Sequence, residues 1–123
     1  MSSDLTKSYA RIQKSTPGGR HGEAAAFVET ARKIHEAAQA PIDVSAYARS
    51  LQNNQKLWTL LQASLLEDEG RLPEDLRQDI LKLSIFVDKQ TLKALALPSF
   101  ENVASLIDIN RNMAGGLFQK PKE

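Results

Sequence analysis

Apolar residues recur at steps of three and four along most of this chain, and that spacing is what most constrains its fold. Between residues 22 and 118 the spacing forms four runs, which are separated by Pro41, Pro73 and Pro98. A period of three to four residues places apolar side chains on one face of an α-helix, whereas a half-buried strand needs strict alternation. No alternation lasts beyond a few residues. The sequence therefore predicts an all-α protein, a compact bundle of about four helices with short connections.

Local signals predict the ends of the first two helices. The first should run from about Gly22 to near Ala40, because Pro41 cannot continue a helix. Asp43 suits the N-cap of the second helix, since its carboxylate can accept hydrogen bonds from backbone N–H groups two or three residues on. The acidic run at 67–69 should lie just outside the C-terminus of that helix, where carboxylates oppose the helix dipole.

The last two helices are bounded in a similar way. Pro73 is predicted to be the first residue of the third helix, because its fixed φ angle suits that position. Ser99 should be the N-cap of the fourth helix. Gly115 and Gly116 should close the fourth helix with left-handed conformations, which would let residues 117–118 fold back on its last turn.

Three segments follow from these boundaries. Residues 1–21 are expected to form an N-terminal arm that is flexible or loosely docked, because it is mostly polar and carries Leu5, Tyr9 and Ile12 at helix-like spacing. Residues 22–118 should form the helical domain. Residues 119–123 should be a disordered tail.

The sequence contains none of the residue patterns that common active sites require. It has 123 residues, which suits one domain, and no cysteine, which excludes disulfides and thiolate chemistry. His21 and His35 are fourteen residues apart, which is roughly 20 Å along one helix, so they cannot share a metal ion. We find no HExxH, CxxC, DxDxDG or Gly-x-Ser-x-Gly pattern. We therefore predict a protein that is not an enzyme and has no cofactor and no metal site.

The charge distribution argues against direct contact with nucleic acid. Sixteen Lys and Arg residues are balanced by fifteen Asp and Glu residues, and the two kinds are interspersed. Nucleic-acid binders usually concentrate their basic residues, because phosphate neutralisation supplies most of their affinity. Apolar stretches are also too short to form a signal peptide or to cross a bilayer. The chain is therefore expected to be soluble and cytoplasmic, with no membrane contact.

The predicted helices carry more apolar surface than one small bundle can cover. The second helix adds Leu57 beside its main apolar stripe, and Trp58 fits either a core anchor, which we favour, or an interface hot spot. The third helix has a second stripe outside its main one. Asn110 interrupts the stripe of the fourth helix and is expected to satisfy a core backbone group, the alternative being to position a partner. The predicted partner-binding residues are Leu57, Trp58, Leu61, Leu81, Ile85 and Leu92.

Several motifs occur in a specific order along the chain. An alanine-rich helix that ends in a proline turn is followed by Leu57-Trp58, by LPEDLR at 72–77 and by IDINRNMAGGL at 107–117. This ordered set resembles the FlaF family, the flagellar biosynthesis regulators of alphaproteobacteria. The likeness spans residues 22–118, whereas the arm at 1–21 departs from it.

The resemblance implies a cytoplasmic protein that binds flagellin and promotes its production, export and filament assembly as a chaperone-like regulator. Family members are also linked to FlbT, a regulator that acts on flagellin mRNA. The alternative is therefore a post-transcriptional regulator of flagellin synthesis, acting on the mRNA directly or through FlbT. A homo-oligomer formed through the extra stripe is a third possibility. We favour flagellin binding, because amphipathic flagellin helices need cover before export and a helical protein with spare apolar stripes can supply it.

Overall fold

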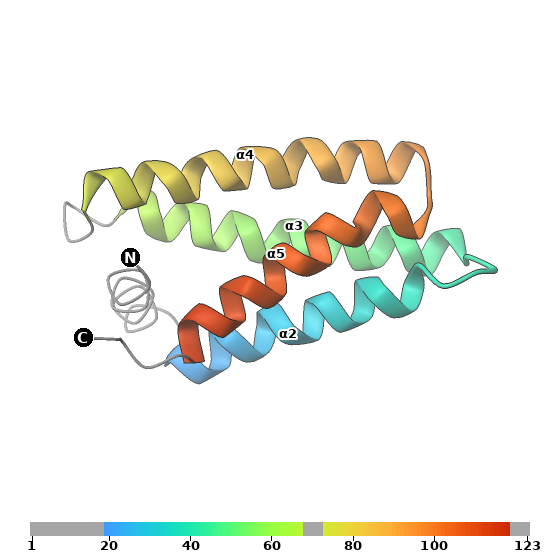
Figure 1. Ribbon diagram of the computed structural model, residues 1–123, viewed down its shortest axis with the longest axis horizontal. Helices are drawn as coiled ribbons and strands as arrows, with labels where there is room; N and C mark the ends of the chain where they lie inside the picture. The colour runs from blue at the N-terminus through green and yellow to red at the C-terminus, as the bar shows by residue number, and fades with distance from the viewer. Residues whose placement is uncertain (1–18, 68–72, 119–123) are drawn as a thin grey trace.

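The computed structural model describes residues 19–67 and 73–118, and four α-helices contain almost all of them. The helices are α2 (Gly19–Ala37), α3 (Val44–Leu66), α4 (Glu74–Ala96) and α5 (Phe100–Phe118) (Figure 1). These two ranges contain no strand, so the prediction of an all-α protein is confirmed. The predictions for most of the arm and for the tail concern residues 1–18 and 119–123, which lie outside the described residues.

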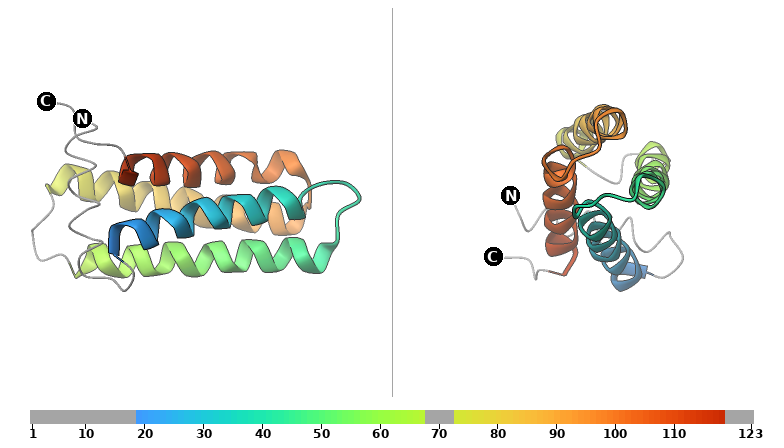
Figure 2. Two further views of the ribbon diagram at one scale, coloured as in Figure 1. Left: turned by 90° about the horizontal axis from the view of Figure 1, so that it is seen from below. Right: turned by 90° about the vertical axis from the view of Figure 1, so that its right-hand side faces the viewer.

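Each helix runs antiparallel to the one before it, and the four pack as an up-down-up-down bundle. α3 packs against α2 and α4, and α5 packs against α4 and α2, so α2 and α4 lie opposite each other. Figure 2 shows this arrangement from the side and from one end. α5 begins beside the end of α4 and finishes beside the start of α2 (Figure 1). The α2–α5 pair has the most extensive contact, which suits the small side chains of Ala24, Ala31 and Ala114 that these helices bury.

The first helix differs from its predicted bounds at both ends. α2 begins at Gly19, so residues 19–21 of the predicted arm are helical. It ends at Ala37 rather than near Ala40. Ala38 still donates its backbone N–H to the carbonyl of Ile34 at 3.0 Å. The helix then stops, because Pro41 has no N–H to donate and disfavours a helical conformation at the residue before it.

Both predicted N-caps are present. Oδ1 of Asp43 accepts from the backbone N–H groups of Ser45 at 3.0 Å and Ala46 at 3.3 Å. The Ser99 hydroxyl accepts from the N–H of Asn102 at 3.2 Å, three residues on. Each cap provides an acceptor for N–H groups in a first turn, where no helical carbonyl is available.

Two predicted ends are wrong. Pro73 is the N-cap of α4 rather than its first residue, and its carbonyl already accepts from the N–H of Arg77 at 3.0 Å. At the other end of the chain, Gly115 does not close α5, which continues to Phe118 without folding back. A glycine costs a helix about 1 kcal/mol relative to alanine. Burial of Ala114 and its neighbours against α2 outweighs that cost, so packing sets this helix end.

Trp58 lies at the centre of the core and joins two kinds of contact. Its side chain is fully buried, and its ring meets Phe27 of α2 edge to face with centroids 5.7 Å apart. Its Nε1 donates to Oδ1 of Asn110 on α5 at 3.0 Å, and Nδ2 of Asn110 donates to Oδ1 of Asn54 at 2.7 Å. Asn110 was expected to satisfy a backbone group. It bonds two side chains of α3 instead.

The Trp58 N–H fixes the orientation of both amides. An indole nitrogen can only donate, so Asn110 must present its oxygen to Trp58 and its NH₂ group to Asn54. Asn54 must then present its oxygen, which directs its own Nδ2 elsewhere. That Nδ2 is buried and has no acceptor among the described residues. A buried donor without an acceptor costs on the order of 1–3 kcal/mol, which offsets part of what the two hydrogen bonds of this network contribute.

Side chains also join the two ends of the α3–α4 pair. Near the start of α3, the hydroxyl of Tyr47 donates to the carbonyl of Ala94 in the last turn of α4 at 2.8 Å. At the other end, Nε of Arg77 donates to the carbonyl of Leu65 at 3.2 Å. Both acceptors belong to last turns, where a carbonyl lacks the N–H group four residues on that would bond it within a helix. Each bond therefore satisfies a helix end as well as joining two helices.

Candidate interaction surface

One row of apolar side chains on α4 lies largely outside the core. Leu81, Ile85 and Leu92 are spaced by four and seven residues, which places them within about 40° of one another around the helix. Leu81 is partly buried and packs on the core, whereas Ile85 is 53% exposed and Leu92 is 65% exposed. We call these three residues the α4 apolar row. Asp88, which is exposed, lies between Ile85 and Leu92 along the helix and at one edge of this stripe.

The α4 apolar row is outside because another face of α4 already occupies the core. Two polar residues on that core face are satisfied within the helix. Ser84 Oγ donates to the carbonyl of Leu81 at 2.7 Å, and Thr91 Oγ1 donates to the carbonyl of Val87 at 2.6 Å. Turning the row inward would expose this complete core face. The buried residues on it are Ile80, Ser84, Val87, Thr91 and Ala94.

The contacts of α4 show which neighbour lies beside the row. Nε2 of Gln90 donates to the carbonyl of Asn102 at 2.8 Å, so the flank of α4 that carries Gln90 faces α5. The α4 apolar row lies about 160° around the helix from Gln90, given 100° per residue. Because α4 packs only on α3 and α5 to any extent among the described helices, the row lies on the α3 side.

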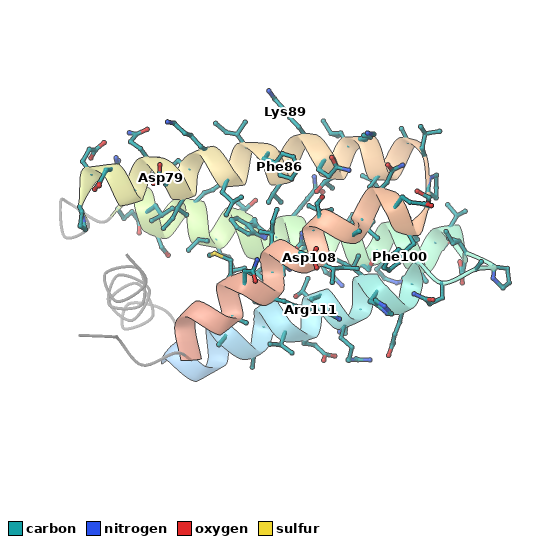
Figure 3. All side chains as sticks on the ribbon, in the orientation of Figure 1. Asp79, Phe86, Lys89, Phe100, Asp108 and Arg111 are labelled. Atoms are coloured by element: carbon teal, nitrogen blue, oxygen red, sulfur yellow. The ribbon has the colours of Figure 1, made fainter. Side chains whose placement is uncertain are left out.

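Three exposed lysines form a second row next to the first. Lys89 and Lys93 follow Lys82 by seven and eleven residues. The three lysines therefore share one side of α4, about 80° around the helix from the α4 apolar row. We call them the lysine row. Within the described ranges, none of the three has a carboxylate oxygen within 4.0 Å of its ammonium group. Figure 3 shows Lys89 projecting from α4 away from the other helices.

The six predicted partner-binding residues do not form one surface. Trp58 and Leu61 are 0% and 2% exposed, and Leu57 is partly buried against the core. Trp58 and Leu61 have almost no surface left for a partner in the closed bundle, and Trp58 has the core position that we favour. Leu57, like Leu81, keeps part of its surface exposed. The α4 apolar row contains the two most exposed residues of the predicted set, Ile85 and Leu92.

Sequence reasoning missed two features of these helices. The lysine row could have been found in the sequence, because residues seven and eleven positions apart share one side of a helix. The bonded amides of Asn54 and Asn110 could also have been found, since each residue takes the place of an apolar residue in a core stripe. Polar residues in two such stripes predict that they meet, because buried polar groups need partners.

Other candidate sites have weaker support. A hollow between α2 and α3 is lined mostly by polar residues, among them Lys33, Glu36 and Arg49. The part of the chain that the structure describes has no group of three His, Cys, Asp or Glu side chains placed to hold a metal ion. Nor does it have a helix that is both long enough and apolar enough for a bilayer. His35 contacts the ring of Phe100 edge to face, with centroids 5.3 Å apart, at the boundary between α2 and α5.

Comparison with known proteins links the chain to one family. The family model described as flagellar protein FlaF matches residues 5–117. This match covers nearly the whole chain and includes most of the predicted arm, so the family pattern begins well before residue 22. No curated protein and no solved structure matches the chain.

Proposed function

This chain belongs to the FlaF family of flagellar proteins, and we propose that it binds flagellin in the cytoplasm and promotes its production, export and filament assembly. In this role it is a chaperone-like regulator. It covers an apolar face of flagellin that would otherwise associate with other flagellin molecules before export.

The observation that supports this proposal is the exposure of Ile85 and Leu92. Neither side chain can turn inward, because the core face of α4 is complete. Burying a large aliphatic side chain fully contributes about 1.5–3 kcal/mol relative to leaving it in water. Ile85 is 53% exposed and Leu92 is 65% exposed, so a partner that covered both would gain roughly 2–3.5 kcal/mol from contacts that the free protein does not make.

The shape of the surface favours a helical partner. The α4 apolar row follows a single helix over about three turns, with steps of four and seven residues. An amphipathic helix presents apolar residues at the same steps, so the two can pack side by side along their length. Such a helix is the form that the family resemblance implies for the terminal segments of flagellin.

A regulator that contacts flagellin mRNA is the second candidate, and the lysine row is the feature that favours it. Lysines alone can neutralise phosphates. Yet single-stranded RNA is usually held by several aromatic side chains that stack on successive bases. Beside the lysine row the described residues offer one exposed aromatic, Phe86, which is 43% exposed and lies between Lys82 and Lys89. We therefore favour a protein partner. Action through FlbT stays a prediction from the family resemblance.

Binding can be tested with purified protein and monomeric flagellin. We expect co-elution in size-exclusion chromatography and a measurable Kd by titration calorimetry. Leu92→Asp should weaken the complex at least tenfold, because it puts a carboxylate in the apolar contact. The proposal fails if both proteins are folded and no complex forms at micromolar concentrations.

Leu60→Asp provides a matched control on another helix. Leu60 of α3 is 67% exposed, almost the same as Leu92. Asn53 lines the hollow between α2 and α3. Leu60 comes two helical turns after Asn53, so it also lies on the α2 side of α3. The same substitution at Leu60 should leave the affinity within about twofold. Equal loss from both variants would mean that flagellin contacts a broader or different surface.

A further inference from the structure

We propose that the segment bound by α4 is an amphipathic helix with an acidic flank, whose apolar seam covers the α4 apolar row and whose carboxylates face the lysine row. The inference rests on the proposed function and deepens it, because it states the chemistry of the flagellin segment that is recognised.

The two rows on α4 have the geometry that such a helix requires. Leu81 to Leu92 and Lys82 to Lys93 each cover eleven residue steps, which is roughly 16 Å of helix. The rows run parallel and are about 80° apart, a separation similar to that between the apolar seam and the charged flank of a paired helix. A single helix could therefore contact both rows over three turns.

The charges on α4 determine which flank fits. The lysine row carries three positive charges, and none has a carboxylate partner within 4.0 Å among the described residues. Glutamates or aspartates facing this row would gain attraction along its whole length and would favour one orientation of the partner. Asp88 lies on the opposite side of the stripe from the lysines, so a basic or amide residue of the partner should face it.

A second copy of this chain is a poorer occupant than an acidic helix. An antiparallel pair of α4 helices related by a two-fold axis would bring one lysine row against the other. A parallel pair would set each lysine row beside the flank of Asp88, with three ammonium groups against one carboxylate. Both pairings leave like charges close together, which lowers affinity.

The N-terminal segment of the chain also has the wrong charge. Residues 1–18 contain Lys7, Arg11 and Lys14 against the single acid Asp4. If this segment formed a helix with its apolar residues toward Ile85 and Leu92, the three basic residues would lie on the opposite side, which leaves Asp4 as the single carboxylate that could meet the lysine row. Charge complementarity thus favours a segment of another protein.

Two synthetic helical peptides can test the proposed chemistry directly. Both carry leucine at the same heptad positions, and they differ only in having glutamate or lysine at the flanking positions. In fluorescence anisotropy with the full-length protein, we expect the glutamate peptide to bind at least tenfold more tightly than the lysine peptide. The difference should shrink as salt is raised, because exposed charge pairs are screened.

Charge reversal on the protein should remove this preference. In Lys82→Glu/Lys89→Glu, the glutamate peptide should lose at least tenfold in affinity, while helicity is kept because both side chains are exposed. Lys33→Glu/Arg49→Glu changes the net charge equally in the hollow between α2 and α3. That control should leave the preference within about twofold of the wild type.

The outcomes separate the inference from the proposed function. Flagellin binding that is unchanged in Lys82→Glu/Lys89→Glu overturns the acidic flank and leaves the proposed function intact. Failure of the wild type to bind flagellin, with the glutamate peptide still bound, overturns the proposed function and supports the acidic flank. The inference is overturned if the two peptides bind with equal affinity, or if neither peptide binds.

Two further measurements test the other occupants. A dimer seen by analytical ultracentrifugation that is lost in Leu92→Asp would assign the surface to a second copy and overturn the inference. A gel shift with flagellin leader RNA that is lost in Lys82→Glu/Lys89→Glu, without peptide binding, would assign the lysines to RNA and overturn it as well. A monomer that gives no gel shift but binds the glutamate peptide is the result we expect.

Discussion

Trp58 of α3 and Asn110 of α5 are bonded to each other at the centre of the bundle, with the indole Nε1 3.0 Å from Oδ1 of the amide. These two helices are not neighbours around the bundle, so the bond crosses its middle. It fixes the position of Asn110 along α3 to within one helical turn, because the same amide must also reach Asn54. A core of aliphatic side chains alone would allow more registers between opposite helices.

Asn110→Ala should lower the free energy of unfolding by about 2–4 kcal/mol. The substitution leaves the Trp58 N–H without an acceptor, leaves Oδ1 of Asn54 without its donor and opens a small cavity. Urea denaturation followed by Trp58 fluorescence, from the only tryptophan in the chain, gives the change directly. Asn112→Ala serves as a control, because Asn112 is exposed on the same helix. A loss below 1 kcal/mol at Asn110 would contradict the role of the network.

Tyr47→Phe should reduce stability by about 1 kcal/mol, because the carbonyl of Ala94 loses its hydrogen-bond donor. Burial raises the pKa of Tyr47, and the backbone N–H of Ser99 partly opposes that shift. The folded state therefore holds the phenolic proton to a higher pH than the unfolded chain does. The stability contributed by Tyr47 is then complete below the ordinary tyrosine pKa of 10.0 and is lost as pH rises through the folded value.

Chemical denaturation at a series of pH values tests the sign of this effect. The difference in unfolding free energy between wild type and Tyr47→Phe should be constant at neutral pH and should shrink above about pH 10. Absorbance at 295 nm should show one tyrosine with a raised pKa that is missing from the variant. A difference that grows at alkaline pH would show that the phenol ionises more easily in the folded protein.

Arg77→Ala should destabilise the protein by about 1 kcal/mol, because the Leu65 carbonyl loses the donor that Nε supplies. Glu74→Gln is the informative comparison. It removes the ion pair between Arg77 and Glu74, which has an N···O distance of 3.5 Å and an exposed carboxylate, and leaves the bond to Leu65. Exposed pairs contribute about 0–1 kcal/mol, so Glu74→Gln should have the smaller effect in thermal denaturation. The reverse order would assign the role of Arg77 to the ion pair.

Aspartate at Ile85 and at Leu61 should have opposite effects on folding. Ile85 is 53% exposed, so Ile85→Asp should keep the helical circular dichroism spectrum and change stability by less than about 1 kcal/mol. Leu61 is 2% exposed, and Leu61→Asp should unfold the chain or cost more than about 4 kcal/mol, since a carboxylate would enter the core. If Ile85→Asp also unfolded the protein, the α4 apolar row would be part of the core.

Periodicity predicted the helices well, because each one buries a continuous stripe. Local chemistry also predicted the caps at Asp43 and Ser99, where a side-chain oxygen within three residues decides the helix start. The end of α5 could not be read in this way. Gly115 favours termination locally, but packing against α2 continues the helix, and that packing depends on residues far away in the sequence.

The candidate surface was predicted only in part, for a similar reason. Trp58 and Ile85 are both large apolar residues beside an apolar stripe, and nothing local tells which one the bundle encloses. Burial depends on which neighbours each helix meets. α3 turns Trp58 toward Phe27 and Asn110, whereas α4 turns Ile85 away from the core.

The bonds of Tyr47 to Ala94 and of Arg77 to Leu65 join α3 and α4 at both ends, so these two helices should move together as one stiff hairpin. A segment that docks along α4 would then meet a preorganised platform, and little conformational entropy would be lost on this side of the complex. Most of the ordering on binding would fall to the incoming segment. Its own tendency to form a helix in isolation should therefore govern both how tightly and how fast it is captured.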